Sequence, residues 1–195
     1  MRLFVFARHA ESVLNIERIV SGDPGHSVQL TESGVEQARR LGIQVAHLPL
    51  ALCLHTRFDR TRRTAELALA GRGVPFEVEP LLDDINVGEL DGLSVDAYRA
   101  WKREHSRSDR FPGGESLDEA ARRYALAYRQ LLARPGAAVL VVCHEIPIRY
   151  ALNAASGAHS LDGPVHDIGN AQPFLFDEEA LERAAERVEA LSGPR

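Results

Sequence analysis

The sequence predicts an α/β protein of three layers, in which a mostly parallel central sheet carries helices on both faces. One observation is that short apolar runs of the β type alternate along the chain with segments whose apolar residues recur at helical spacing. A second is the length of 195 residues, which suits one domain with a sizeable core and is short for two. We therefore expect a single domain over residues 1–195. It has an insertion at about 82–115, an irregular stretch rich in Asp, Gly and Arg that we place over the active site.

The expected strands are short apolar runs, most of which lead directly into polar or charged residues. They lie at residues 3–7, 51–54, 137–142 and 174–176. Such runs are typical of strands that are buried on both faces of a sheet.

The expected helices are marked by capping residues and by their apolar periodicity. Thr31 is a suitable N-cap for the first helix, and Asp59 for the second, which ends at Gly71. Ser116 and Glu119 form a capping box at the start of a third helix. Pro147 suits the first turn of a fourth helix that runs to about residue 155, and residues 178–191 form a charged last helix.

The bulk properties exclude several classes of function. A net charge of −5 argues against a general nucleic-acid-binding protein, which would usually be basic. No apolar stretch approaches the roughly 18 residues of a membrane helix, and the apolar run near the N-terminus is too short for a signal peptide. Cys53 and Cys143 both lie in apolar runs, so we expect two buried thiols and a reducing, cytoplasmic setting. The sequence leaves a homodimer open.

Basic side chains follow three of the expected strands. Arg8 and His9 end the first run, Arg60 follows the second, and His144 follows the third. Because the carboxyl ends of parallel strands meet at the ligand-binding edge of an α/β sheet, these side chains are expected to lie together. Because unpaired buried charge is costly, we expect the ligand of these basic side chains to be an anion. His9 is a candidate nucleophile.

A wider set of motifs follows the same order as in a known family. The pieces are Arg8-His9-Ala10-Glu11-Ser12 with Asn15, Leu30-Thr31-Glu32-Ser33-Gly34, Arg60 with Thr64-Ala65, Asp84 four residues before Gly88, Pro112-Gly113-Gly114-Glu115-Ser116, and His144. Together they resemble branch 1 of the histidine phosphatase superfamily, the phosphoglycerate-mutase-like proteins. The resemblance covers roughly residues 3–176 and implies a phosphohistidine intermediate, with no metal and no cofactor.

Each of these residues has a role that phosphoryl chemistry explains. Arg8 and Arg60 offer planar forks of donors to phosphate oxygens, and Asn15 adds an uncharged donor. His144 supplies a third cation if it is protonated. A neutral His9 attacks phosphorus in line and forms the phosphohistidine, which water later hydrolyses.

The leaving group of such a reaction needs a proton, for which several carboxyl groups compete. Asp84 is the candidate general acid and base, and the choice rests on the family spacing before Gly88. Asp83 and Glu89 are its neighbours and rivals. The resemblance gives Asp84 the same role.

Other features of the sequence favour alternatives. Cys143 and Arg149 have the C-x5-R spacing of cysteine phosphatases, but the residues between them include no glycine, which a phosphate-cradling loop needs. Ala10 and Glu145 replace glycines that are usual in the family. Glu145 would repel a phosphate dianion unless it points away or pairs with an arginine, and it also favours a protein that only binds a phosphorylated ligand. The basic residues between Arg99 and Arg110 are interpreted as a solvated face.

The family contains both hydrolases and mutases. A mutase must shield its phosphohistidine from water, and family mutases are generally longer, with a middle segment and a tail that cover the site. Here the stretch from Gly92 to Pro112 is short and the chain after Phe176 reads as one polar helix. We therefore expect a metal-independent phosphomonoesterase that acts on a small phosphorylated metabolite. Phosphoglycerate-mutase-type transfer is the alternative.

Overall fold

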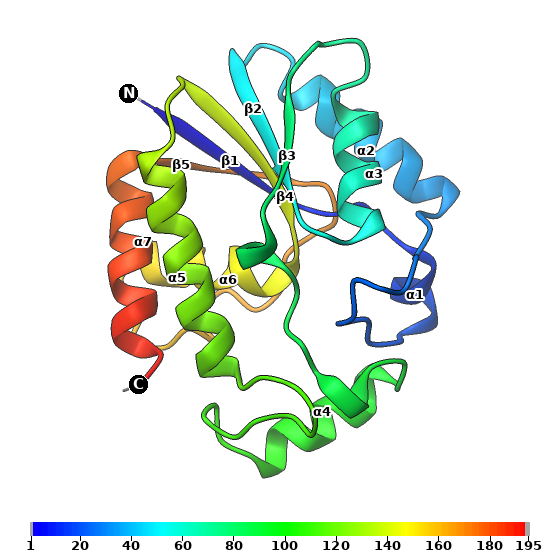
Figure 1. Cartoon of the computed structure of the whole chain (residues 1–195), viewed down its shortest axis with the longest axis vertical. Coiled ribbons are helices and arrows are strands. Elements are labelled where there is room, and N and C mark those ends of the chain that lie inside the picture. Colours follow the sequence, from blue (N-terminus) through cyan, green and yellow to red (C-terminus); the bar gives the residue numbers. More distant parts are fainter. Residues whose placement is uncertain (1, 194–195) are drawn as a thin grey trace.

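The computed structural model describes residues 2–193 and contains a five-stranded sheet with the strand order β3-β2-β4-β1-β5 (Figure 1). The strands are β1 (Leu3–Arg8), β2 (Leu50–His55), β3 (Phe76–Val78), β4 (Ala138–Cys143) and β5 (Pro173–Asp177). The first four are parallel, and β5 runs antiparallel along the edge of β1. The predicted α/β class with a mostly parallel sheet is therefore confirmed.

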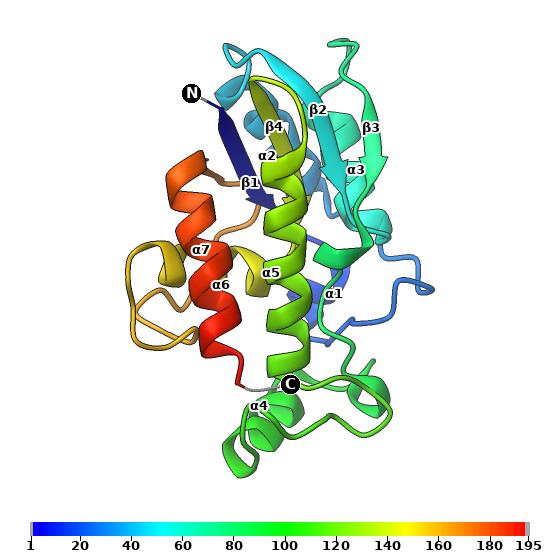
Figure 2. The same cartoon turned by 60° about the vertical axis from the view of Figure 1, so that its left-hand side comes forward.

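Helices cover both faces of the sheet (Figures 1 and 2). On one face lie α2 (Glu32–Gln44) and α3 (Asp59–Ala68), and on the other lie α5 (Leu117–Ala133), α6 (Glu145–Ala155) and α7 (Glu178–Leu191). Alternate residues of β1 supply the two cores: Val5 and Ala7 pack with α2 and α3, whereas Phe4 and Phe6 pack with α5 and α7. The sheet is thus buried from both sides, and ligands can reach it only at its edges.

Most helix ends follow the expected capping chemistry. The Thr31 hydroxyl accepts a hydrogen bond from the Gly34 amide, and Ser116 and Glu119 form the complete capping box. Asp59 is not a cap, contrary to expectation: Phe58 holds the N-cap position and Asp59 is the first residue of α3. There its carboxylate lies in the first turn, where the helix dipole favours negative charge.

Several short elements were not predicted from the sequence. The edge strand β3 is three exposed residues long, and α1 (Val13–Glu17) is little more than one turn. Residues 82–115 contain a one-turn 3₁₀ helix, Gly88–Leu90, and α4 (Val95–Glu104). α4 lies beyond the carboxyl ends of the strands, next to the N-terminal end of α5 (Figure 2). That this segment is an insertion stays a prediction.

Within the described range 2–193, none of the helices is both long enough and apolar enough to cross a membrane.

Candidate active site

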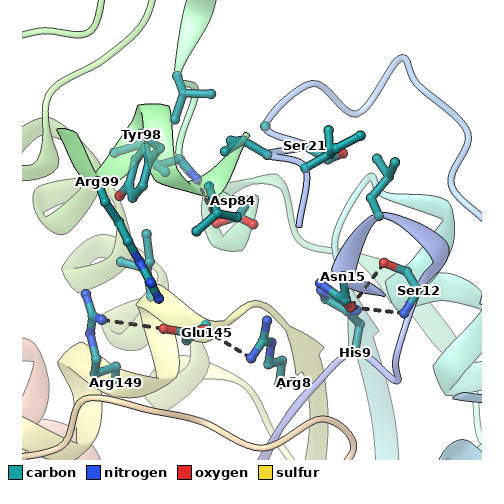
Figure 3. A pocket seen from close by; sticks show the side chains of 18 of the residues that line it. Arg8, His9, Ser12, Asn15, Ser21, Asp84, Tyr98, Arg99, Glu145 and Arg149 are labelled. Atoms are coloured by element: carbon teal, nitrogen blue, oxygen red, sulfur yellow. Dashed lines mark hydrogen bonds and ion pairs between the residues drawn. The ribbon is translucent and has the colours of Figure 1, made fainter. Parts of the chain in front are cut away.

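A pocket of about 640 Å³ opens at the carboxyl edge of the sheet and gathers residues from elements that lie far apart in sequence (Figure 3). β1 contributes Arg8 and the following His9, α3 contributes Arg60, and α6 contributes Glu145. Asp84 comes from the loop after the 3₁₀ helix Pro80–Leu82. The structure therefore brings together side chains that the sequence placed at separate strand ends.

His9 is buried, with 3% of its surface exposed, and its ring orientation is fixed. Its Nδ1 lies 2.8 Å from the carbonyl oxygen of Ala10, which can only accept, so Nδ1 carries the proton. Nε2 is then the ring nitrogen with a free lone pair. Burial, followed by the charges of Arg60 and Arg8, holds the pKa of His9 well below its usual range. The ring is neutral at pH 7, as a nucleophile requires.

Arg60 is the central cation of the pocket and is 4% exposed. Its guanidinium donates to the hydroxyl and carbonyl oxygens of Ser21 at 3.1 and 3.0 Å, and it contacts Asp84 Oδ2 at 3.3 Å. Five donors on one rigid plane can hold these partners and still contact an anion.

Arg8 is held from two sides. Its Nη1 donates to the carbonyl oxygen of Ile168 at 2.8 Å and lies 3.0 Å from Glu145 Oε2. Its buried Nε has no hydrogen-bond partner in the described part of the chain. The rest of the guanidinium lines the pocket beside His9, where its charge favours a phosphate oxygen.

His144 lies beneath His9, with ring centroids 5.6 Å apart, and is fully buried. Arg60 Nη2, which can only donate, lies 3.3 Å from His144 Nδ1, so the His144 proton is on Nε2, which contacts the Thr56 hydroxyl at 2.9 Å. Burial, with the charge of Arg60, lowers the pKa of His144 well below its usual range. In the free site, therefore, His144 is neutral and is not the third cation that its protonation would provide.

Asp84 and its rivals have different surroundings. Asp84 lines the pocket, and its Oδ2 lies 3.4 Å from His144 Nδ1. Asp83 is turned toward Arg57 and accepts hydrogen bonds from its backbone N–H and from its side-chain Nε–H. Neither Asp83 nor Glu89 lines this pocket. Burial raises the pKa of Asp84 and Glu145 adds to this, while Arg60 opposes it. A raised pKa is what a carboxyl group needs to donate a proton near neutral pH.

Asn15 forms the wall opposite Asp84 (Figure 3). Its side-chain oxygen accepts from the amide and the hydroxyl of Ser12, at 3.0 and 3.1 Å. This leaves the amide nitrogen as the group that can donate to a ligand.

The structure places two residues that favoured alternatives to the main prediction, Glu145 and Cys143. Glu145 is the first residue of α6, and its carboxylate faces the pocket between Arg8 and Arg149, 3.0 and 3.5 Å away (Figure 3). The Cys143 thiol lies outside the pocket in the core, where burial raises its pKa, so it is not a thiolate facing a ligand.

The basic residues after Gly92 that were interpreted as a solvated face include three that line the pocket, and two of these, Arg99 and Arg103, are exposed. Arg99, Lys102 and Arg103 line the pocket from α4, together with Tyr98 on the same face. Arg107 and Arg110 do not; they pair with Asp118 and Glu119, respectively. The spacing of Val95, Tyr98, Arg99, Lys102 and Arg103 is helical, and this periodicity was the signal that could have found the face.

The described residues 2–193 contain no group of three or more His, Cys, Asp or Glu side chains that could hold a metal ion.

The fold and this pocket define an α/β protein of the histidine phosphatase type. The model of the histidine phosphatase superfamily (branch 1) matches residues 4–189, and the chain belongs to this superfamily.

Among curated relatives, the chain is 30% identical to a 2,3-bisphosphoglycerate-dependent phosphoglycerate mutase of Methylobacterium sp. (strain 4-46), over 90% of each chain. Among solved structures, it is similar in fold to a putative α-ribazole-5′-P phosphatase from Escherichia coli, with a TM-score of 0.78, 21% identity and coverage of 91% of both chains. It is also similar to a mycobacterial glucosyl-3-phosphoglycerate phosphatase, with a TM-score of 0.76, 22% identity, and coverage of 90% of this chain and 92% of the other. Superfamily members named for both phosphatase and mutase activity are thus similar to this chain.

Proposed function

We propose that the protein is a metal-independent phosphomonoesterase that forms a phosphohistidine on His9. The observation that carries the proposal is the state of the His9 ring, which is buried, neutral, and held by its Nδ1 proton to the Ala10 carbonyl. Arg8 and Arg60 lie beside it and offer donors to the phosphate oxygens.

In the first half of the proposed reaction, the Nε2 lone pair of His9 attacks phosphorus and the bond from phosphorus to the ester oxygen breaks. The electron pair of that bond goes to the leaving oxygen, which takes the proton of Asp84. In the second half, the Asp84 carboxylate accepts a proton from water, whose oxygen attacks phosphorus. The N–P bond breaks, inorganic phosphate leaves, and both residues return to their starting states.

The charge inside the pocket supports an anionic substrate. Its lining includes six arginine and lysine side chains, Arg8, Arg60, Arg99, Lys102, Arg103 and Arg149, and three carboxylates, Asp84, Glu145 and Asp167. The whole chain has a net charge of −5, so this excess of positive charge is local. A small phosphorylated metabolite is the proposed partner.

The position of the last helix supports a hydrolase over a mutase. α7 packs against α5 and α6, and none of the described residues after Asp167 lines the pocket. This part of the chain therefore does not shield a phosphohistidine from water, as a mutase would require. Mutase-type transfer is the second candidate, because the curated relative named above is a phosphoglycerate mutase.

The test is to trap the intermediate. Brief incubation with a ³²P-labelled phosphomonoester in the presence of EDTA, followed by rapid quenching, should leave label that is stable to alkali and labile to acid. His9→Ala should abolish the label, while the control Cys143→Ser should retain it. Label on Cys143, or full turnover by the His9 variant, would contradict the proposal.

A screen of phosphorylated metabolites then separates the candidate functions. Release of inorganic phosphate supports the phosphatase, whereas movement of phosphate between the 2- and 3-positions of phosphoglycerate without release supports the mutase. Tight binding of a phosphorylated metabolite with no turnover would support the third alternative, a binding protein.

A further inference from the structure

Glu145 places a negative charge inside a pocket that otherwise gathers cations. The sequence pattern led us to expect a glycine at this position, so the carboxylate is a departure from that expectation. About 31% of the Glu145 side chain is exposed, and the open part faces the pocket (Figure 3). The position at the start of α6 explains a negative charge near a helix N-terminus, but it does not explain why the side chain turns to two arginines.

The two arginines on either side of Glu145 are held by other groups as well. Arg8 also donates to the Ile168 carbonyl, and Arg149 donates to the His166 carbonyl at 3.3 Å and to Asp162 at 3.4 Å. Asp162 in turn pairs with Arg107. Glu145 is therefore one member of a network of ion pairs in which positive and negative side chains alternate. If Glu145 turned away from the pocket, Arg8 and Arg149 would lose the carboxylate that they share.

The same contacts place Glu145 next to a bound phosphate. Arg8 is adjacent to His9, lines the same pocket, and contacts Glu145 through Nη1 at 3.0 Å. A phosphate that accepts a hydrogen bond from another N–H group of this guanidinium lies about 5–6 Å from the carboxylate, the width of the group with a hydrogen bond on each side. The first atoms of the leaving group beyond the ester oxygen are within the same reach.

We infer that Glu145 determines substrate specificity: its carboxylate occupies the place where a second anionic group of the substrate would pair with Arg8 and Arg149, and it selects leaving groups that carry a hydroxyl or ammonium donor there. A hydroxyl two or three atoms from the phosphate donates to the carboxylate. A substrate carboxylate at that position meets a like charge, and the arginines that would neutralise it are already paired. The inference rests on the proposed phosphomonoesterase.

The test compares two phosphomonoesters of the same carbon skeleton, glycerol 3-phosphate and 3-phosphoglycerate, which differ in a hydroxymethyl group against a carboxylate. We expect the unmodified protein to have the higher kcat/KM for glycerol 3-phosphate. In Glu145→Gln the ratio of the two kcat/KM values should move toward 3-phosphoglycerate by about 10-fold or more, because one like-charge contact at short range is removed. Glu145→Gly, which restores the residue usual in the family, should move the ratio in the same direction.

A matched control is Glu32→Gln. Glu32 is likewise the first residue of a helix, α2, but it is exposed and does not line the pocket. The Glu32→Gln variant removes the same charge from the same helical position, and the ratio of the two kcat/KM values should not change. Thermal unfolding of all three variants shows whether each is folded.

Other outcomes would overturn the inference. An unchanged ratio in both Glu145 variants would mean that the residue serves only the helix end, and an equal fall for both substrates would mean that it only positions Arg8. A loss confined to substrates with poor leaving groups would make Glu145 the proton donor.

Failure of the proposed function is recognised separately. It would appear as no phosphate release from any substrate by the unmodified protein. The same selectivity ratio can then be measured as the calorimetric binding of the two phosphates, which requires no turnover.

Discussion

Asp84 is surrounded by groups that have opposite effects on the pKa of its carboxyl group. Burial and Glu145 raise its pKa, while Arg60, Arg8 and the Ile85 amide lower it, and the net direction is upward. At its usual pKa a carboxyl group is ionised at neutral pH and cannot donate. The upward shift extends the pH range over which the group is a general acid.

Replacing this carboxyl group should affect substrates according to their leaving groups. Asp84→Asn should slow hydrolysis of an alkyl phosphate by about 10²–10⁴-fold and slow that of p-nitrophenyl phosphate much less, because the nitrophenolate needs no proton. The limb of the kcat/KM profile that falls as pH rises should disappear for the alkyl substrate. Steady-state kinetics of both substrates from pH 4 to 8 measure this.

Arg60→Ala is the comparison, since a cation that binds phosphate oxygens serves both reactions and its loss should slow both alike. If Asp83→Asn shows the leaving-group dependence and Asp84→Asn does not, the acid has been misassigned.

The sequence predicted the positions of these residues better than their protonation states. His9, Arg60 and His144 follow strands, so topology alone places them at one sheet edge. The neutral state of His144 depends on burial under Phe58 and on contact with Arg60, which a sequence without coordinates does not contain. The partners of Glu145 were left open for the same reason.

The loop that carries Asp84 is held in place by α5. Arg123, on α5, donates to the carbonyl oxygens of Leu81 and Asp83, at 2.9 and 3.0 Å, and pairs with Glu115. The Glu115 carboxylate also accepts from the Asn86 amide at 2.9 Å. A loop with little regular structure is thereby fixed on both sides of its catalytic candidate.

We expect Arg123 to be a positioning residue. Arg123→Ala should lower kcat for an alkyl phosphate by about 10–100-fold, since a shift of about 1 Å in a reacting group costs this much. The effect on p-nitrophenyl phosphate should be smaller, because the displaced group is the acid. Kinetics with both substrates check this, with circular dichroism to verify folding.

Arg129→Ala is the matched control on the same helix, because Arg129 is exposed and pairs with Glu189 instead of the loop. An equal loss for both substrates in Arg123→Ala would point to a general loss of structure.

The elements were predictable where capping and periodicity agree. α2, α5 and α7 begin at or beside the residues that marked them, Thr31, Ser116 and Glu178, and Pro147 lies in the first turn of α6. β3 and α1 were missed because three to five residues carry too little pattern. α4 was missed because the Asp-, Gly- and Arg-rich stretch around it was interpreted as an irregular insertion, although Val95, Tyr98 and Lys102 recur at helical spacing.

Two buried histidines make the stability of the whole molecule depend on pH. His9 and His144 have folded pKa values well below the value of about 6.5 expected when unfolded. Below that pH the unfolded chain binds protons that the folded chain does not, so their contribution to the free energy of unfolding falls as pH decreases. Asp84, whose folded pKa is raised, acts in the opposite sense, and its contribution falls as pH increases.

Urea unfolding curves recorded between pH 7.5 and 5 measure how the free energy of unfolding depends on pH. His144→Asn should lose less stability on acidification than the unmodified protein, because one buried neutral histidine has been removed. His47→Asn should keep the original slope, because His47 is exposed on the surface. Equal slopes in all three proteins would contradict the account.

The position of β1 in the sheet has a consequence for the order in which the protein is made. Among the strands of the described residues, β1 pairs with β4 and β5, whose residues lie at 138–143 and 173–177. During synthesis, therefore, both edges of the strand that carries Arg8 stay unpaired until most of the chain has left the ribosome. His9 and His144 cannot meet before then. A nascent chain halted before β4 would expose the apolar strand to aggregation, and phosphate could not rescue it, because the site that would bind phosphate does not yet exist.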